Sequence, residues 1–240
     1  MEGLKNITTN SDGSKEKTII EEGPYKGCTI TQGFNDTTND DFRGHLGYDI
    51  SGDINEIYPL LDGVIVAIQP SQYYYDENGN IIQEYDEKAG KWVDKKHADG
   101  ITITVKHTNT QGQEYYSTYC HLSSIDQDVV DYFNAHAGEK NIEYPVTTGT
   151  NMGIVGKTGK GVTGVHLHVC VYTRDDPTSN PYGYVDSGRD KVFEDYDNYT
   201  VNGYYYPLPL DKDSKHSTYF DPYLVMITNG EIISLFPYYF

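Results

Sequence analysis

The sequence has few cysteines and few basic residues, and it contains no long apolar run. Its three cysteines, Cys28, Cys120 and Cys170, cannot all pair internally, so they do not form a disulfide framework. Lys and Arg total 18 against 36 Asp and Glu, which gives a formal charge of −18. This argues against a nucleic-acid binder, which needs a basic surface. No run of 18 apolar residues exists, so no segment is expected to span a membrane as a helix.

Aromatic residues and period-2 patterning are what the sequence does have. The hydrophobic share is only 37%, but 24 Tyr and 7 Phe add apolar area. Ile101, Ile103 and Val105 alternate with polar residues, which predicts a half-buried strand. Asp62-Gly63 stands between two apolar runs and predicts a tight hairpin, and residues 109–112 separate two further strand-like runs. The sequence therefore predicts a mainly β fold with an antiparallel sheet.

A single short helix is predicted at about residues 126–137. Val129, Val130 and Phe133 supply its apolar stripe, and Gly138 is a typical helix stop. Because this segment lies between strand-like runs, the helix is expected to be an addition to the β core.

The domain organisation follows from changes in composition along the chain. Residues 1–17 are polar and lack periodicity, which predicts a flexible lead-in. Residues 18–240 are predicted to form a single domain with insertions at about 70–99 and 173–217. The first insertion contains Asn78-Gly79, a strong hairpin signal. The second is too long for an ordinary connection, which favours a functional wall or flap.

Two histidines lie close together on one predicted strand, residues 165–171. Side chains alternate faces along a strand, so Val165, Leu167, Val169 and Val171 are expected to face the core. His166 and His168 then share the other face with Cys170, within reach of one metal ion and its bound water. The alternative is an ordinary strand with two exposed histidines.

Two further segments add polar residues with metal-binding chemistry. His45 and Asp49 can converge on one ion if the chain turns at the neighbouring glycines, and His121 follows an alternating strand. Two histidines and one aspartate leave a fourth position open, which is typical of catalytic zinc sites. Histidines outside that set could act as base, acid or oxyanion partner.

These elements and their order resemble the LytM/lysostaphin-type zinc metallopeptidases, the M23 family. The matching elements are His-x-x-x-Asp at 45–49, Tyr-x-His-Leu at 119–122, Gly-x-x-Gly-x-Thr-Gly at 153–159 and His-x-His at 166–168. The likeness covers about residues 28–227, including an Asp-Pro segment at 221–222. It implies that His45, Asp49 and His168 bind one zinc ion and that His121 and His166 are the catalytic histidines. Which of these two is the base stays open.

The resemblance implies a zinc-dependent endopeptidase that hydrolyses peptide bonds of bacterial peptidoglycan stem or cross-bridge peptides. The implied fold is an antiparallel β-sheet core with a long groove walled by loops at 70–99, 126–150 and 173–217. Such an enzyme is expected to be a monomer and to act outside the cell or in the cell envelope, with a leader or anchor upstream of Met1. The alternatives are a non-catalytic wall-binding or regulatory module of the same fold, and a carbohydrate-binding β-sandwich.

The sequence departs from the family pattern at two points. Val165 stands where the family usually has Pro, and residues 35–44 contain no Tyr. Two other residues near the motifs have separate interpretations. His107 is expected to be structural, and Cys170 is expected to be a plain reduced thiol and not a ligand.

Overall fold

The computed structural model describes residues 18–20, 24–33, 45, 47–109, 112 and 114–172, together with short strand segments at 200–201, 204–205 and 219–220. Within these residues every strand pair is antiparallel and there is one helix, which confirms the predicted mainly β class. The predicted lead-in at 1–17 and most of the predicted insertion at 173–217 lie outside the described residues, as does the Asp-Pro segment at 221–222.

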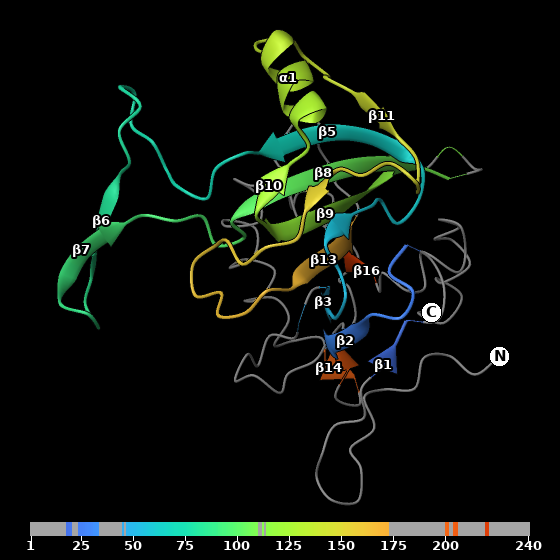
Figure 1. The fold of residues 1–240 in the computed structure, drawn as a ribbon, viewed down its shortest axis with the longest axis horizontal. Helices are drawn as coiled ribbons and strands as arrows, with labels where there is room; N and C mark the ends of the chain where they lie inside the picture. The colour runs from blue at the N-terminus through green and yellow to red at the C-terminus, as the bar shows by residue number, and fades with distance from the viewer. Residues whose placement is uncertain are drawn as a thin grey trace, which may run out of the picture.

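Nine strands of the described chain form the main sheet (Figure 1). They run in the order β1-β2-β3-β13-β9-β8-β5-β11, and β16 pairs with the end of β13. Their bounds are β1 Thr18–Ile19, β2 Thr29–Gln32, β3 Tyr48–Ser51, β5 Gly63–Gln69, β8 Ile101–Thr108, β9 Glu114–Leu122, β11 Tyr144–Val146, β13 Leu167–Tyr172 and β16 Tyr219–Phe220. Strand β13, which carries His168, is flanked by β3 and β9, so segments far apart in sequence meet beside it.

A smaller sheet and the helix pack against the main sheet through one apolar core. The small sheet contains β10 (Ser124–Ile125), β12 (Gly153–Ile154) and β4 (Glu56–Ile57), and the helix α1 spans Gln127–Ala135. Buried Ile57, Val129 and Met152 of this layer belong to the same core cluster as the apolar residues of β8, β9 and β13. No helix in the described part of the chain has the length and apolarity needed to span a membrane.

Helix α1 confirms the helix predicted at 126–137. Asp126 caps it by accepting a hydrogen bond from the Asp128 N–H, and Gly138 follows its end with a φ of 90°. A side-chain oxygen at this position satisfies one of the N–H groups that the first turn of a helix leaves without a partner. Figure 1 shows α1 beside β5 at the upper edge of the main sheet.

The predicted hairpin at Asp62-Gly63 is wrong. The strand before it, β4, pairs with β12 in the small sheet, whereas β5 after it pairs with β8 and β11. The Asp-Gly pair therefore connects two sheets. Long-range contacts hold the connection, since the Leu60 N–H donates to the Tyr119 hydroxyl and Asp62 Oδ1 accepts from the Thr148 N–H.

Strand β8 is not half-buried as its alternation predicted. Thr102 and Thr104, expected on a solvated face, are both 0% exposed. The Thr104 hydroxyl lies 3.0 Å from the Thr118 hydroxyl of β9, so its polarity is satisfied inside the protein. A central strand covered on both faces can keep an alternating pattern when threonines pair across the sheet. The predicted connection at 109–112 does join β8 to its partner β9.

Residues 70–99, which are predicted to be the first insertion, form two successive hairpins that project from the body; we call this segment the arm (Figure 1). A bridge between Tyr75 and Ile81 encloses the Asn78-Gly79 turn, which confirms that prediction. The arm continues into β6 (Gln83–Asp86), which pairs with β7 (Lys91–Asp94). A separate short pair is formed by β14 (Thr200–Val201) and β15 (Tyr204–Tyr205).

His107 has the structural role expected of it. It is 2% exposed, and its Nδ1 lies 3.0 Å from the Asp62 carbonyl oxygen while its Nε2 lies 2.7 Å from the Ser117 hydroxyl. A carbonyl only accepts, so Nδ1 carries the proton. Burial lowers the pKa of His107 to about 4, although the hydrogen bond to Asp62 opposes the shift.

We expect His107 to make the fold sensitive to mild acid. Its pKa in the folded state lies below the ordinary 6.5, so the unfolded chain binds the proton more tightly. The free energy of unfolding should therefore fall as the pH drops from 6.5 to 4, by about 3 kcal/mol from this group. Urea unfolding of the protein and of His107→Gln across this range measures the effect. The gap in stability between the two proteins should shrink toward pH 4, and a constant gap would contradict the assignment.

Candidate metal centre

Three of the predicted site residues converge on one point. His45 Nε2 lies 2.9 Å from His168 Nδ1 and 3.2 Å from Asp49 Oδ1, and His168 Nδ1 lies 3.0 Å from Asp49 Oδ1. Each residue offers one ligand atom, so this group could hold a metal ion. The side chains are 10–18% exposed, so the group is largely buried.

The spacing of the three atoms fits a small tetrahedral cation. Zinc binds nitrogen and oxygen ligands at about 2.0–2.1 Å, which puts tetrahedral ligand atoms about 3.3 Å apart. The observed separations of 2.9–3.2 Å are close to that value. Two imidazoles and one carboxylate are also a donor set that zinc favours, whereas Ca²⁺ and Mg²⁺ prefer oxygen ligands throughout.

The charge state of the group also suits a cation. Burial alone raises the pKa of Asp49, but its contacts with the His168 and His45 rings outweigh it and hold the pKa well below its usual range. Burial lowers the pKa of His168 to about 4, partly offset by its hydrogen bond with Asp49. Near neutral pH the carboxylate is therefore ionised and His168 is neutral, as metal ligands must be.

Strand pairing places Asp49 and His168 side by side. The two residues are direct partners in the register of β3 and β13, and paired residues point to the same face of an antiparallel sheet. Gly47 allows this approach, because a Cβ there would collide with the Val169 carbonyl. His45 comes from the segment before β3, and its Nδ1 lies 3.1 Å from the Gly33 carbonyl oxygen. That carbonyl fixes the proton on Nδ1 and leaves Nε2 as the ligand atom.

A β-bulge turns His121 toward the same point. In the pairing of β8 with β9, Ile103 faces Tyr119 but Ile101 faces Leu122, so β9 has one extra residue there. His121 has a φ of 66°, which a residue other than glycine rarely adopts outside functional or strained sites. Its ring centroid lies 4.8 Å from that of His166 and 5.9 Å from that of His168. Bulges commonly reorient a side chain in this way.

Backbone carbonyls fix the protonated nitrogen of both predicted catalytic histidines. His121 Nδ1 lies 3.0 Å from the Thr158 oxygen, and His166 Nδ1 lies 3.0 Å from the Gly164 oxygen. Each Nδ1 therefore carries a proton, and each Nε2 is the second functional atom of its ring. His166 Nε2 lies 3.7 Å from Asp49 Oδ1, which places it beside the metal-binding group.

Sequence analysis did not identify the residues that hold these rings. Gly33, Thr158 and Gly164 act through backbone carbonyls, which leave no side-chain signal. The glycines of residues 153–159 are the one sequence feature which indicates that this backbone comes close to another segment. In the structure, Thr158 also receives the Ile101 N–H on its hydroxyl, while the hydroxyl donates to the Leu122 carbonyl.

The apolar residues and the cysteine of the His-x-His strand were both given a predicted environment. Leu167, Val169 and Val171 are buried as predicted, but Val165 is 58% exposed, because β13 begins only at Leu167. Cys170 is buried and forms no disulfide bond, and its Sγ lies 4.0 Å from the Thr118 carbonyl oxygen. Its interpretation as a plain thiol stays a prediction. Cys28 and Cys120 are also buried and form no disulfide bond.

The fold and site together define an antiparallel β-sheet protein with a His-Asp-His group that can hold a divalent metal, flanked by two further histidines. No family model matches the chain, and no curated protein matches it. A solved structure described as "Identification and structural characterization of LytU" is similar, with 19% identity over 69% of this chain and 90% of that chain. The TM-score is 0.40, so the fold described here follows from the strand pairing and not from this likeness.

Proposed function

We propose that this protein is a zinc-dependent endopeptidase of the LytM/lysostaphin type that hydrolyses peptidoglycan stem or cross-bridge peptides. The observation that carries the proposal is the convergence of five polar side chains from three separate motifs. His45 and Asp49 come from one motif, His121 from a second, and His166 and His168 from a third. The sequence resemblance had assigned a role to each of these residues.

In this proposal His45 Nε2, Asp49 Oδ1 and His168 Nδ1 hold the zinc. A zinc ion at this position would supply Lewis acidity, which polarises the scissile carbonyl and brings the pKa of an attacking water toward about 7. Asp49 is the one carboxylate of the three and offsets part of the cation's charge. Each imidazole would bind the cation through an unprotonated ring nitrogen, and the contact of His45 Nδ1 with the Gly33 carbonyl leaves Nε2 free for that role.

His121 and His166 provide the proton chemistry. Both rings have Nδ1–H bonded to a backbone carbonyl, so each ring is held in one orientation with Nε2 as its reactive atom. The neutral form of either ring can accept a proton from water at Nε2. The protonated form can donate from Nε2 to the developing oxyanion or to the leaving amine. A pair of histidines beside one metal therefore supplies both functions.

The remaining elements of the proposal follow from its substrate. Peptidoglycan lies outside the cytoplasmic membrane, so the protein would act in the cell envelope or outside the cell. We further propose that residues 18–240 form one peptidase domain that works as a monomer, with a substrate groove bordered by the arm and by residues 126–150.

Metal removal is the direct test. Purified protein should contain about one zinc per chain, and incubation with purified peptidoglycan should release new amines. Dialysis against a chelator should reduce this release to the level of buffer alone, because in this proposal the cation supplies the Lewis acidity that activates the water and polarises the carbonyl. Added zinc should restore it. Binding to peptidoglycan without cleavage by the zinc-loaded protein would contradict the proposal and support a non-catalytic wall-binding module.

A further inference from the structure

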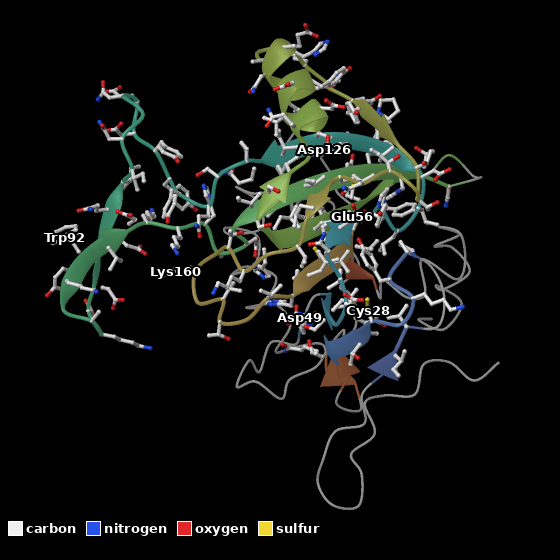
Figure 2. All side chains as sticks on the ribbon, in the orientation of Figure 1. Cys28, Asp49, Glu56, Trp92, Asp126 and Lys160 are labelled. Carbon is white, nitrogen blue, oxygen red and sulfur yellow. The ribbon has the colours of Figure 1, made fainter. Side chains whose placement is uncertain are left out.

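Exposed apolar side chains are concentrated on the arm. Among the described residues seven large apolar side chains are exposed, and five of them lie on the arm: Tyr75, Ile81, Ile82, Tyr85 and Trp92. Scattered exposed apolar residues are normal, but their concentration on one element indicates a binding surface. Figure 2 shows Trp92 near the far end of the arm, well away from the main sheet.

The pairing of β6 with β7 puts two aromatic rings and two polar groups on one face. Tyr85 pairs with Trp92, and Gln83 pairs with Asp94, so all four side chains point to the same side of the hairpin. We call these four residues the outer face. Tyr85 and Trp92 are 53% and 65% exposed, and their ring centroids lie 5.7 Å apart. Gln83 Nε2 donates to Asp94 Oδ1 at 3.3 Å.

The opposite side of the arm is attached to the loop that precedes His166. Glu84, whose side chain points away from the outer face, accepts from Lys160 Nζ at 2.7 Å. The Gly159 N–H donates to Gln72 Oε1, and the Lys160 N–H donates to the His97 carbonyl. Thr158, the next residue toward the N-terminus, is the one whose carbonyl holds His121. The arm is thus connected to the candidate metal centre through contacts with residues 158–160, and its outer face is directed to solvent.

The charge of the arm resembles that of the whole chain. Residues 70–99 contain four lysines and seven acidic residues, a net charge of −3, and the chain carries −18. An acidic arm on an acidic protein repels an anionic polymer. A neutral partner meets no electrostatic barrier there, which favours an uncharged ligand.

We propose that the outer face binds the glycan strands of peptidoglycan, an inference that rests on the proposed function and names a second part of its substrate. A pyranose ring presents a face of C–H groups that are slightly positive, and the face of an aromatic ring is slightly negative, so the two stack. Trp92 and Tyr85 supply such rings. Asp94 accepts hydrogen bonds from sugar hydroxyl or acetamido N–H groups, and Gln83 both accepts and donates. The arm thereby holds the glycan while the metal centre addresses the peptide.

The sequence makes this proposal convenient to test, because Trp92 is the only tryptophan in the chain. Tryptophan emission of the full-length, zinc-loaded protein therefore reports on the outer face alone. Titration with a soluble chito-oligosaccharide, which has no peptide bond to cut, should give a saturable change in emission. Tyr85→Ala should weaken this binding about tenfold, as expected for loss of an important aromatic contact. Tyr75→Ala, an exposed tyrosine on the other hairpin of the arm, is the matched control and should bind normally.

A second measurement connects the outer face to turnover. Trp92→Ala should raise the KM for intact peptidoglycan about tenfold, with kcat unchanged and with normal cleavage of a short soluble stem peptide. Circular dichroism confirms that the variant is folded.

Several outcomes would overturn the proposal. One is the absence of a saturable emission change with the sugar, and another is that Tyr75→Ala weakens sugar binding as much as Tyr85→Ala does. The others are an emission change that depends on protein concentration without sugar, and a response to stem peptide or teichoic acid instead of glycan. Glycan binding without peptidoglycan cleavage would leave the outer face confirmed and refute the proposed function. Cleavage without glycan binding would refute the proposal for the outer face and support the proposed function.

Discussion

Replacement of Asp49 with Asn is expected to remove the bound zinc and to lower peptidoglycan hydrolysis by about 10³-fold or more. Asp49 is the ionised member of the metal-binding group, and its contacts with the His168 and His45 rings keep its pKa low. An amide of the same shape offers an oxygen but no negative charge, so the cation loses its one anionic ligand. Zinc content per chain and the rate of amine release from peptidoglycan measure the two effects.

Asp53→Asn is the matched control for this substitution. Asp53 follows β3 by two residues and is exposed, so it makes the same change in net charge without touching the metal-binding group. The control should keep its zinc and its activity. If Asp49→Asn kept both as well, the metal assignment would be wrong. Loss of activity with full zinc content would indicate that Asp49 acts in catalysis and is not a metal ligand.

The second large effect is expected at the two histidines outside the metal-binding group. His121→Ala and His166→Ala should each retain about one zinc per chain while kcat falls by about 10²–10⁴-fold, the usual contribution of a positioned acid or base. Neither ring is among the three ligands that converge on the metal point. The experiment combines metal analysis with steady-state kinetics on peptidoglycan.

His136→Ala is the control for this pair, since His136 lies at the end of α1 and bonds to the Tyr132 carbonyl. It should leave zinc content and kcat unchanged. The double variant His121→Ala/His166→Ala should lose less than the product of the single losses, because residues that act as one unit are not additive. Loss of zinc from either single variant would assign that histidine to the metal and contradict the proposed roles.

Local patterns predicted a substantial part of the fold. The alternation in residues 165–171 correctly placed Leu167, Val169 and Val171 in the apolar core, because side chains alternate on any strand regardless of its neighbours. The apolar spacing and terminal glycine of the helix predicted α1, and Asn78-Gly79 predicted its hairpin. These signals depend only on residues close together in sequence.

Predictions failed where distant segments decide the outcome. Asp62-Gly63 has the composition of a hairpin turn, yet contacts from Tyr119 and Thr148 direct the chain from one sheet to the other. Thr102 and Thr104 have the pattern of a solvated face, but β8 lies inside a sheet covered on both sides. Burial of both faces depends on which strands pair, and a period of two residues does not contain that information.

The candidate site divides in the same way. The sequence by itself determined which residue types are available, namely two imidazoles on one strand face, a His-x-x-x-Asp pair and a further histidine, in an order that resembles a known family. Only the tertiary structure decided that His45, Asp49 and His168 meet at distances that suit one cation. It also decided that a bulge turns His121 toward them and that the arm holds Trp92 in solvent. Register, bulges and backbone contacts are set by packing between segments far apart in the chain, so they become definite only when the whole sheet has formed.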